Sequence, residues 1–146
     1  SSVDNNSTPV DSDIRFTENA DLKYSVVSQI NTIDRNSDGL IDHLYFGDLA
    51  GQAFRVDINN APKLTGTPTA GDLKNNFVKR VVTLFSEQVS TGLSPRFYEM
   101  PAFSTYSNSG TTFGVASIGS GNRSLPRFNS SSTSYKNDAI YNIAFF

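Results

Sequence analysis

The stretch from Ile33 to Ile58, IDRNSDGLIDHLYFGDLAGQAFRVDI, decides the fold of this chain of 146 residues. Two of its segments have the composition of β-strands, His43 to Gly47 and Gln52 to Ile58, and the second alternates polar and apolar residues. Between them, Asp48 to Gly51 is a short turn that ends in glycine. Together the three pieces predict an antiparallel β-hairpin.

Directly before this hairpin, the residues DRNSDGLID have the spacing of a calcium-binding loop. Ca²⁺ takes about six to eight oxygen ligands, so a short loop binds it only if alternate residues point inward and the backbone turns sharply. Gly39 supplies the sharp turn. Tyr45 stands where a helix-flanked EF-hand has a bidentate Glu, so the loop is a shorter variant in which Asp42 closes the shell. The predicted Ca²⁺ ligands are the side chains of Asp34, Asn36, Asp38 and Asp42 and the backbone carbonyl of Leu40.

The simpler interpretation of this loop is a surface turn without metal, since Asn, Asp, Ser and Gly dominate turns in general. Correctly spaced oxygen-bearing side chains together with the glycine favour calcium over that interpretation. A single loop without a paired partner suits the high calcium concentration outside the cytosol. The loop therefore predicts an extracellular or periplasmic protein.

The remainder of the chain also has the composition of β-structure. Tyr24 to Ile33 (YSVVSQINTI) is rich in β-branched residues and predicts a strand that runs into the calcium loop. Lys74 to Val89 is ambiguous, because its apolar residues recur at helical spacing, but dense β-branched and aromatic residues favour a strand. Further extended segments are predicted at Arg96–Tyr106, Thr111–Gly119 and Asn137–Phe146. Since no long capped helix is evident, the predicted class is all-β.

Composition limits the domain organisation and the possible partners. Residues 1–23 are predicted to be a loop-rich lead-in, and residues 24–146 the β-domain. The net charge of −2, from 12 basic and 14 acidic residues, gives no footprint for nucleic acid. No apolar run is long enough to span a membrane. The chain has no cysteine, which excludes a disulfide scaffold, a thiolate zinc site and a cysteine nucleophile.

Several other residues have both a functional and a structural interpretation. Asp48 and Asp57 could be paired carboxylates for hydrolysis, but a turn residue and a solvent-facing strand residue are the favoured interpretations. His43 is the only histidine and could sense pH or bind a metal, but without a second His or Cys it is expected on the surface. A group of aromatic residues could form a ligand-binding face, but alternate strand positions predict that they belong to the core; they are Tyr45, Phe46 and Phe54.

Four segments, in their order along the chain, resemble the β-propeller domain of the PilY family, the tip-associated adhesins of type IV pili. They are IDRNSDGLIDHLYFGDLAGQAFRVDI, RFYEMPAFS, FGVASIGSGNRSLPRF and DAIYNIAFF. In that family a short calcium loop leads into a YxGDxxGxxWRxD hairpin, and a GSGNRxxP segment precedes a strand with a YxIxD-like ending. This chain differs at Phe54, where the family usually has Trp, and at Ala144 to Phe146, where an acidic residue is often found. The resemblance covers residues 24–146.

The resemblance implies a non-enzymatic protein of the bacterial cell surface, exported through the periplasm to the pilus tip. It implies roles in pilus biogenesis, extension and retraction, twitching motility and surface attachment, with minor pilins and host or abiotic surfaces as partners. It carries the calcium role over to Asp34, Asn36, Asp38, Leu40 and Asp42. At about 40–50 residues per blade, the chain would supply roughly three blades, too few for a closed ring. The rest of a longer chain is therefore expected as a further partner.

Two alternatives belong to other functional classes. One is an integrin-like propeller in which calcium only stiffens a scaffold for protein or glycan binding; a single calcium loop argues against it, because about three blades should carry about three loops. The other is a quinone-dependent propeller dehydrogenase, which shares the GDxxG hairpin. The absence of Trp docking motifs and of an acid/base constellation argues against this enzyme.

Overall fold

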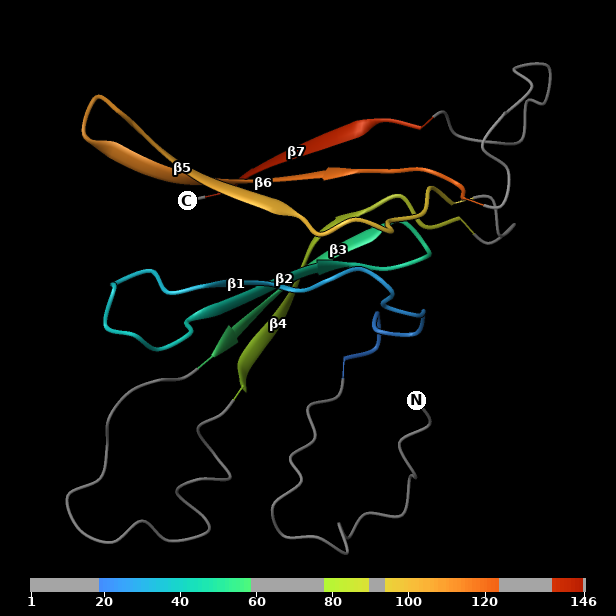
Figure 1. Ribbon diagram of the computed structural model, residues 1–146, viewed down its shortest axis with the longest axis horizontal. Coiled ribbons are helices and arrows are strands. Elements are labelled where there is room, and N and C mark those ends of the chain that lie inside the picture. Colours follow the sequence, from blue (N-terminus) through green and yellow to red (C-terminus); the bar gives the residue numbers. More distant parts are fainter. Residues whose placement is uncertain (1–18, 59–77, 90–93, 124–137, 146) are drawn as a thin grey trace, which may run out of the picture.

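The computed structural model describes residues 19–58, 78–89, 94–123 and 138–145, which form two antiparallel β-sheets and no helix (Figure 1). The first sheet has four strands in the order β1-β2-β3-β4, and the second has three in the order β5-β6-β7. Within this part of the chain, no helix is long and apolar enough to cross a membrane. The strands are β1 (Asn31–Ile33), β2 (His43–Gly47), β3 (Gln52–Ile58), β4 (Val78–Ser86), β5 (Ala102–Asn108), β6 (Thr111–Gly119) and β7 (Ile140–Phe145).

One face of the first sheet carries an apolar cluster that follows from the alternation in β2 and β3. Successive side chains of a strand point to opposite faces, so Phe46, Phe54 and Val56 gather on one side and are buried there. Phe46 and Phe54 are cross-strand partners, and their rings stack with centroids 5.5 Å apart. Burial of each such large side chain contributes about 1.5–3 kcal/mol. Partly buried Leu22, Leu44, Ile58, Val78 and Val81 pack against this cluster.

The opposite face of the first sheet packs against the second sheet. Ala53 of β3 and Ile118 of β6 form a buried cluster there with Phe97, which precedes β5. Gly47 permits the close approach, because a Cβ atom at this position would lie 2.6 Å from Cδ1 of Ile118 and 2.7 Å from Cβ of Phe97. The backbone N–H of Phe97 donates to the carbonyl of Asp48 at 3.1 Å. The two sheets are therefore joined by both apolar packing and a backbone hydrogen bond.

The second sheet is built on the hairpin of β5 and β6. Its turn consists of Ser109 and Gly110, whose φ angles are 50° and 83°. Tight two-residue hairpin loops favour positive φ at both central residues, since this twist matches that of the flanking strands. β7 then pairs antiparallel with the other side of β6.

The predicted all-β class is confirmed. β2, β3 and β6 have the predicted bounds. β4 lies within Lys74–Val89, so the interpretation of that segment as a strand instead of a helix is correct. β7 lies inside its predicted segment, whereas β5 begins later than the predicted extended segment Arg96–Tyr106 and ends two residues beyond it. Most of the predicted lead-in, residues 1–18, lies outside the described residues. The described residues contain two sheets, compared with the three blades' worth of strands that the sequence predicts.

The predicted strand Tyr24–Ile33 is wrong for most of its length, because only Asn31 to Ile33 pair with β2. The preceding residues make single hydrogen bonds instead of a ladder. Leu49 N–H donates to the carbonyl of Ser25 at 3.1 Å, and the Ser28 hydroxyl donates to the carbonyl of Gly47 at 3.3 Å. The Ser28 hydroxyl thus donates to the last carbonyl of β2, at a position where a continuous neighbouring strand would have donated a backbone N–H.

Candidate calcium loop and the neighbouring charge network

The loop from Asp34 to Asp42 connects β1 and β2 and projects beyond the end of the first sheet (Figure 1). Its base is closed by backbone hydrogen bonds. Asp42 N–H donates to the carbonyl of Ile33 at 2.8 Å, and the carbonyl of Asp42 accepts from Ile58 N–H at 2.8 Å. The last predicted ligand is therefore anchored to strands on both sides, β1 and β3.

The carboxylate of Asp34 organises the turn of this loop. It accepts from the backbone N–H of Ser37 at 2.6 Å and of Gly39 at 2.8 Å. Ser37 and Gly39 have positive φ angles of 61° and 88°. The sharp turn predicted at Gly39 is therefore present, and it is the conformation that glycine adopts most easily.

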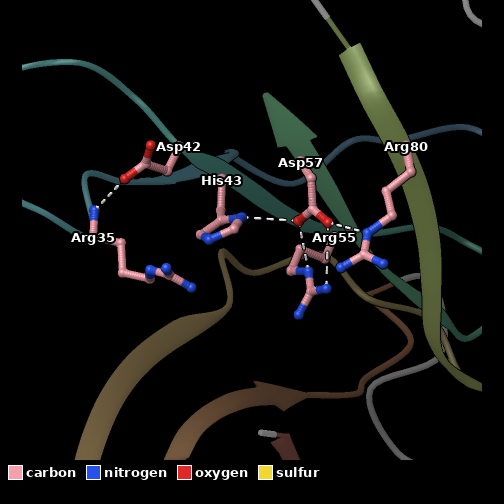
Figure 2. A network of polar contacts seen from close by, with 6 residues as sticks. All are labelled: Arg35, Asp42, His43, Arg55, Asp57 and Arg80. Atoms are coloured by element: carbon pink, nitrogen blue, oxygen red, sulfur yellow. Dashed lines mark hydrogen bonds and ion pairs between the residues drawn. The ribbon is translucent and has the colours of Figure 1, made fainter. Parts of the chain in front are cut away.

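The other predicted side-chain ligands also bond within the loop. The amide nitrogen of Asn36 donates to Asp38 at 3.0 Å, and the Asn36 oxygen accepts from Asp38 N–H at 3.0 Å. Asp38 further accepts from Leu40 N–H at 2.8 Å, and Asp42 accepts from Arg35 N–H at 2.7 Å (Figure 2). Leu40 exposes its side chain. Among the described residues, no group of three or more His, Cys, Asp or Glu side chains lies close enough together to hold a metal ion.

The oxygen atoms that the loop offers as ligands nevertheless match the chemistry of Ca²⁺. Carboxylate, amide and carbonyl oxygens are the hard ligands that this ion takes. A carboxylate that accepts a backbone N–H keeps further lone pairs for a metal. The hydrogen bonds within the loop therefore leave oxygen lone pairs for Ca²⁺ on Asp34, Asp38 and Asp42.

A charge network lies beside this loop, on the face of the first sheet that is turned toward the second. Its centre is Asp57 on β3, and its members occupy directly opposed positions: His43 on β2 is paired with Asp57, and Asp57 with Arg80 on β4. Arg55 lies two residues before Asp57 and therefore on the same face. Figure 2 shows the side chains of His43, Arg55 and Arg80 converging on the Asp57 carboxylate.

The contacts of Asp57 use both of its oxygens. Nδ1 of His43 and Nε of Arg55 each lie 2.8 Å from Oδ1, and Nε of Arg80 pairs with Oδ2. Burial acts to raise the pKa of Asp57, but the hydrogen bonds and charges of Arg80, Arg55 and His43 outweigh it, so this pKa lies below its usual range. Nε of Arg55 is within ion-pair distance but is not directed at the carboxylate as a hydrogen bond.

Two predictions are corrected by this network. Asp57 is buried, not solvent-facing, because the side chains of His43, Arg55 and Arg80 enclose its carboxylate. His43 is only partly exposed and has Asp57 as its partner, so it is not a simple surface residue. Asp48 is the predicted turn residue: its carboxylate accepts from Ala50 and Gln52 N–H at 2.9 Å each. Burial raises the pKa of Asp48, and these two hydrogen bonds only partly oppose the shift.

The predicted core placement of the aromatic group is confirmed. Tyr45, Phe46 and Phe54 are all buried, and burial raises the pKa of Tyr45. The ring of Tyr45 lies 5.2 Å from that of Phe103 on β5 and 5.8 Å from that of Phe145 on β7. Tyr45 thus packs against the second sheet.

Comparison with protein families, curated proteins and solved structures finds no match for this chain. Its function is therefore inferred from its own residues and their arrangement.

Sequence reasoning missed the charge network, although part of its signal was available. The predicted hairpin of β2 and β3, once its register is fixed, places His43 opposite Asp57. Arg80 could not be found in this way, because the pairing of β3 with β4 joins segments separated by a long connection and contains a register shift at Asp57/Ile58.

Proposed function

We propose that this chain is a calcium-binding β-propeller module of a type IV pilus tip-associated adhesin. The observation that carries the proposal is the loop Asp34–Asp42, which supplies oxygen ligands at calcium spacing, turns at Gly39 as such a loop must, and is anchored between strands. The ordered resemblance to the PilY family supports the assignment to pili. The proposed role is non-enzymatic.

The sheet architecture is compatible with a propeller. Propeller blades are four-stranded antiparallel sheets, and β1–β4 form such a sheet with sequential neighbours. β5–β7 would supply three strands of a second blade. The proposed partners are the rest of a longer chain, which would complete the ring, together with minor pilins and a host or abiotic surface. The proposed location is the bacterial cell surface at the pilus tip, reached through the periplasm.

Calcium would neutralise a concentration of negative charge. Asp34, Asp38 and Asp42 belong to one short loop, and their repulsion is relieved when a divalent cation binds. The proposed ligands are these three carboxylates, the Asn36 side chain and the Leu40 carbonyl. Mg²⁺ should compete poorly, because it demands near-octahedral geometry at shorter distances.

Isothermal titration of the purified chain tests the site. We expect binding of one Ca²⁺ in the micromolar to millimolar range, and loss of that binding in Asp34→Ala and Asp42→Ala. Asp138→Ala, which removes an exposed carboxylate outside the loop, is the matched control. At a calcium concentration about a hundred times Kd, the free energy of unfolding should rise by about 2.7 kcal/mol. Unchanged binding in both loop variants, or a thermal melt insensitive to chelator, would reject the site.

The pilus assignment needs a cellular test with the full-length protein. Asp42→Ala removes the closing carboxylate and should mimic the calcium-free state, whereas Asp42→Lys places a positive charge near the loop and should partly mimic the bound state. We expect the two variants to differ in surface piliation or twitching at equal protein levels. Wild-type motility in both would favour the integrin-like scaffold instead.

A further inference from the structure

A pocket of about 440 Å³ lies between the two sheets, and its lining includes one loop residue, Arg35, which is not among the predicted calcium ligands. The first sheet and its loop contribute cationic side chains, and the second sheet contributes aromatic rings and hydroxyls. In Figure 2, the side chain of Arg35 extends from the loop, and those of His43 and Arg55 from the first sheet, toward the strands of the second sheet. The lining includes Arg35, Arg55, Arg80, Phe103, Thr112 and Phe145.

The cationic wall carries more positive charge than its own partners neutralise. Three arginines line the pocket, and Asp57 is the carboxylate that pairs with two of them, Arg55 and Arg80. Arg35 is exposed, and its guanidinium has no ion pair or hydrogen bond among the described residues. Arg35 is therefore the arginine of this wall that is available to pair with an anion.

The aromatic rings of the second sheet occupy the space that a side chain at Gly114 would fill. Gly114 lies on β6, and a Cβ atom there would be 2.8 Å from the ring of Phe145 and 3.1 Å from that of Phe103. Both rings therefore depend on the open backbone at Gly114. The guanidinium carbon of Arg55 lies 5.4 Å from the centroid of Phe145, within the range of a cation–π contact.

We propose that this pocket binds a small organic anion, a carboxylate carried on a ring. Arginine presents a planar fork that matches a carboxylate, and the contact is charge-assisted. The aromatic rings offer a flat apolar surface for the body of such a ligand. Thr112 adds a hydroxyl group to the lining. A bare inorganic anion would leave the aromatic wall without a contact, and a neutral ring would leave the arginine excess uncompensated.

The test uses the full chain after calcium has been removed with a chelator and the chelator has been dialysed away, so that the outcome depends on neither. Benzoate is the probe, benzamide is its neutral isostere, and inorganic phosphate is the anion without a ring. We expect benzoate to shift backbone amide resonances of Arg35, Tyr45, Phe103 and Gly114, with a Kd of about 1 mM, which suits a ligand this small. Benzamide and phosphate should bind at least about tenfold more weakly.

Arg35→Gln is the decisive variant, because this side chain has no contact with Asp57 and its removal leaves the charge network intact. It should weaken benzoate binding by about tenfold, the loss of one charge-assisted contact. Lys79→Gln removes the same charge from the exposed side of β4 and should leave binding unchanged. Equal affinity for benzamide or phosphate, or equal affinity in Arg35→Gln and wild type, would overturn the proposal.

Discussion

Replacing Asp57 with asparagine should lower the free energy of unfolding by about 3 kcal/mol. Removal of one partner from a buried ion pair usually costs about 3–5 kcal/mol, because the other charge stays buried without compensation. Here the cost falls at the lower end. The side chain of Arg55 is 13% exposed and stays desolvated, whereas Arg80 is 60% exposed and can return to water.

This difference predicts the order of the pairwise coupling energies. In double-mutant cycles, Asp57→Asn combined with Arg55→Met should give a coupling of about 2 kcal/mol, as expected for a desolvated pair. The cycle with Arg80→Gln should give less than about 1 kcal/mol, as for exposed pairs. Urea denaturation is the measurement, and Lys79→Gln should change stability by less than about 0.5 kcal/mol. Coupling to Arg80 that equals or exceeds coupling to Arg55 would refute the reasoning.

The same variant should change the acid sensitivity of the fold. The pKa of Asp57 is lowered from its ordinary value of 3.8, because its cationic partners outweigh the burial that acts to raise it. Its contribution to stability is thus present above pH 3.8 and is lost as pH falls through the lower pKa of the folded state. Wild type should lose more stability on acidification than Asp57→Asn. The raised pKa of Asp48 acts in the opposite direction but is common to both proteins.

Gly47→Ala should destabilise the fold by about 1–3 kcal/mol in urea denaturation, because the added methyl would lie less than 3 Å from Ile118 and Phe97. Gly121→Ala is the control, because a Cβ atom there has no neighbour within 4 Å. Equal destabilisation by the two variants would contradict the packing of the two sheets at Gly47. Calcium should tighten benzoate binding by about threefold, since two positive charges added to the loop oppose its carboxylates within about a Debye length of the pocket. By linkage, benzoate should tighten calcium binding by the same factor, and a weaker or unchanged affinity in titrations would reject this coupling.

Local patterns predicted most of the strands, and they failed where the partner was not local. β2, β3 and the turn between them follow from alternation and turn residues within one short stretch. Tyr24–Ile33 has an equally β-like composition, yet only Asn31–Ile33 pair, because the end of β2 takes the hydroxyl of Ser28 in place of a strand amide. Composition indicates which segments can form strands, but the length of each strand depends on how much of a neighbouring strand is available to pair with it.

The same distinction separates the candidate calcium loop from the charge network. The loop is contiguous, so its turn at Gly39 could be predicted from the sequence, whereas its calcium ligands stay a prediction. The alternation of β3 correctly placed Asp57 on the polar face of the sheet. It could not show that Arg80 helps to enclose the Asp57 carboxylate, because the pairing of β3 with β4 joins segments separated by a long connection. The interpretation of Asp57 as solvent-facing was therefore wrong for a non-local reason.

Arg35 connects the two proposed sites. Its backbone N–H holds Asp42 within the loop, and its side chain lines the pocket. A calcium ion on the Asp42 carboxylate would compete with the Arg35 N–H for its oxygens, so we expect the position of Arg35 in the pocket wall to depend on calcium. His43 directly follows Asp42 and joins the Asp57 network, which also holds Arg55 and Arg80. We therefore expect the carboxylates of the loop and the arginines of the pocket to be coupled through the backbone as well as through their charges. A module of this construction would respond to calcium in its affinity for anions even if both sheets stayed fixed.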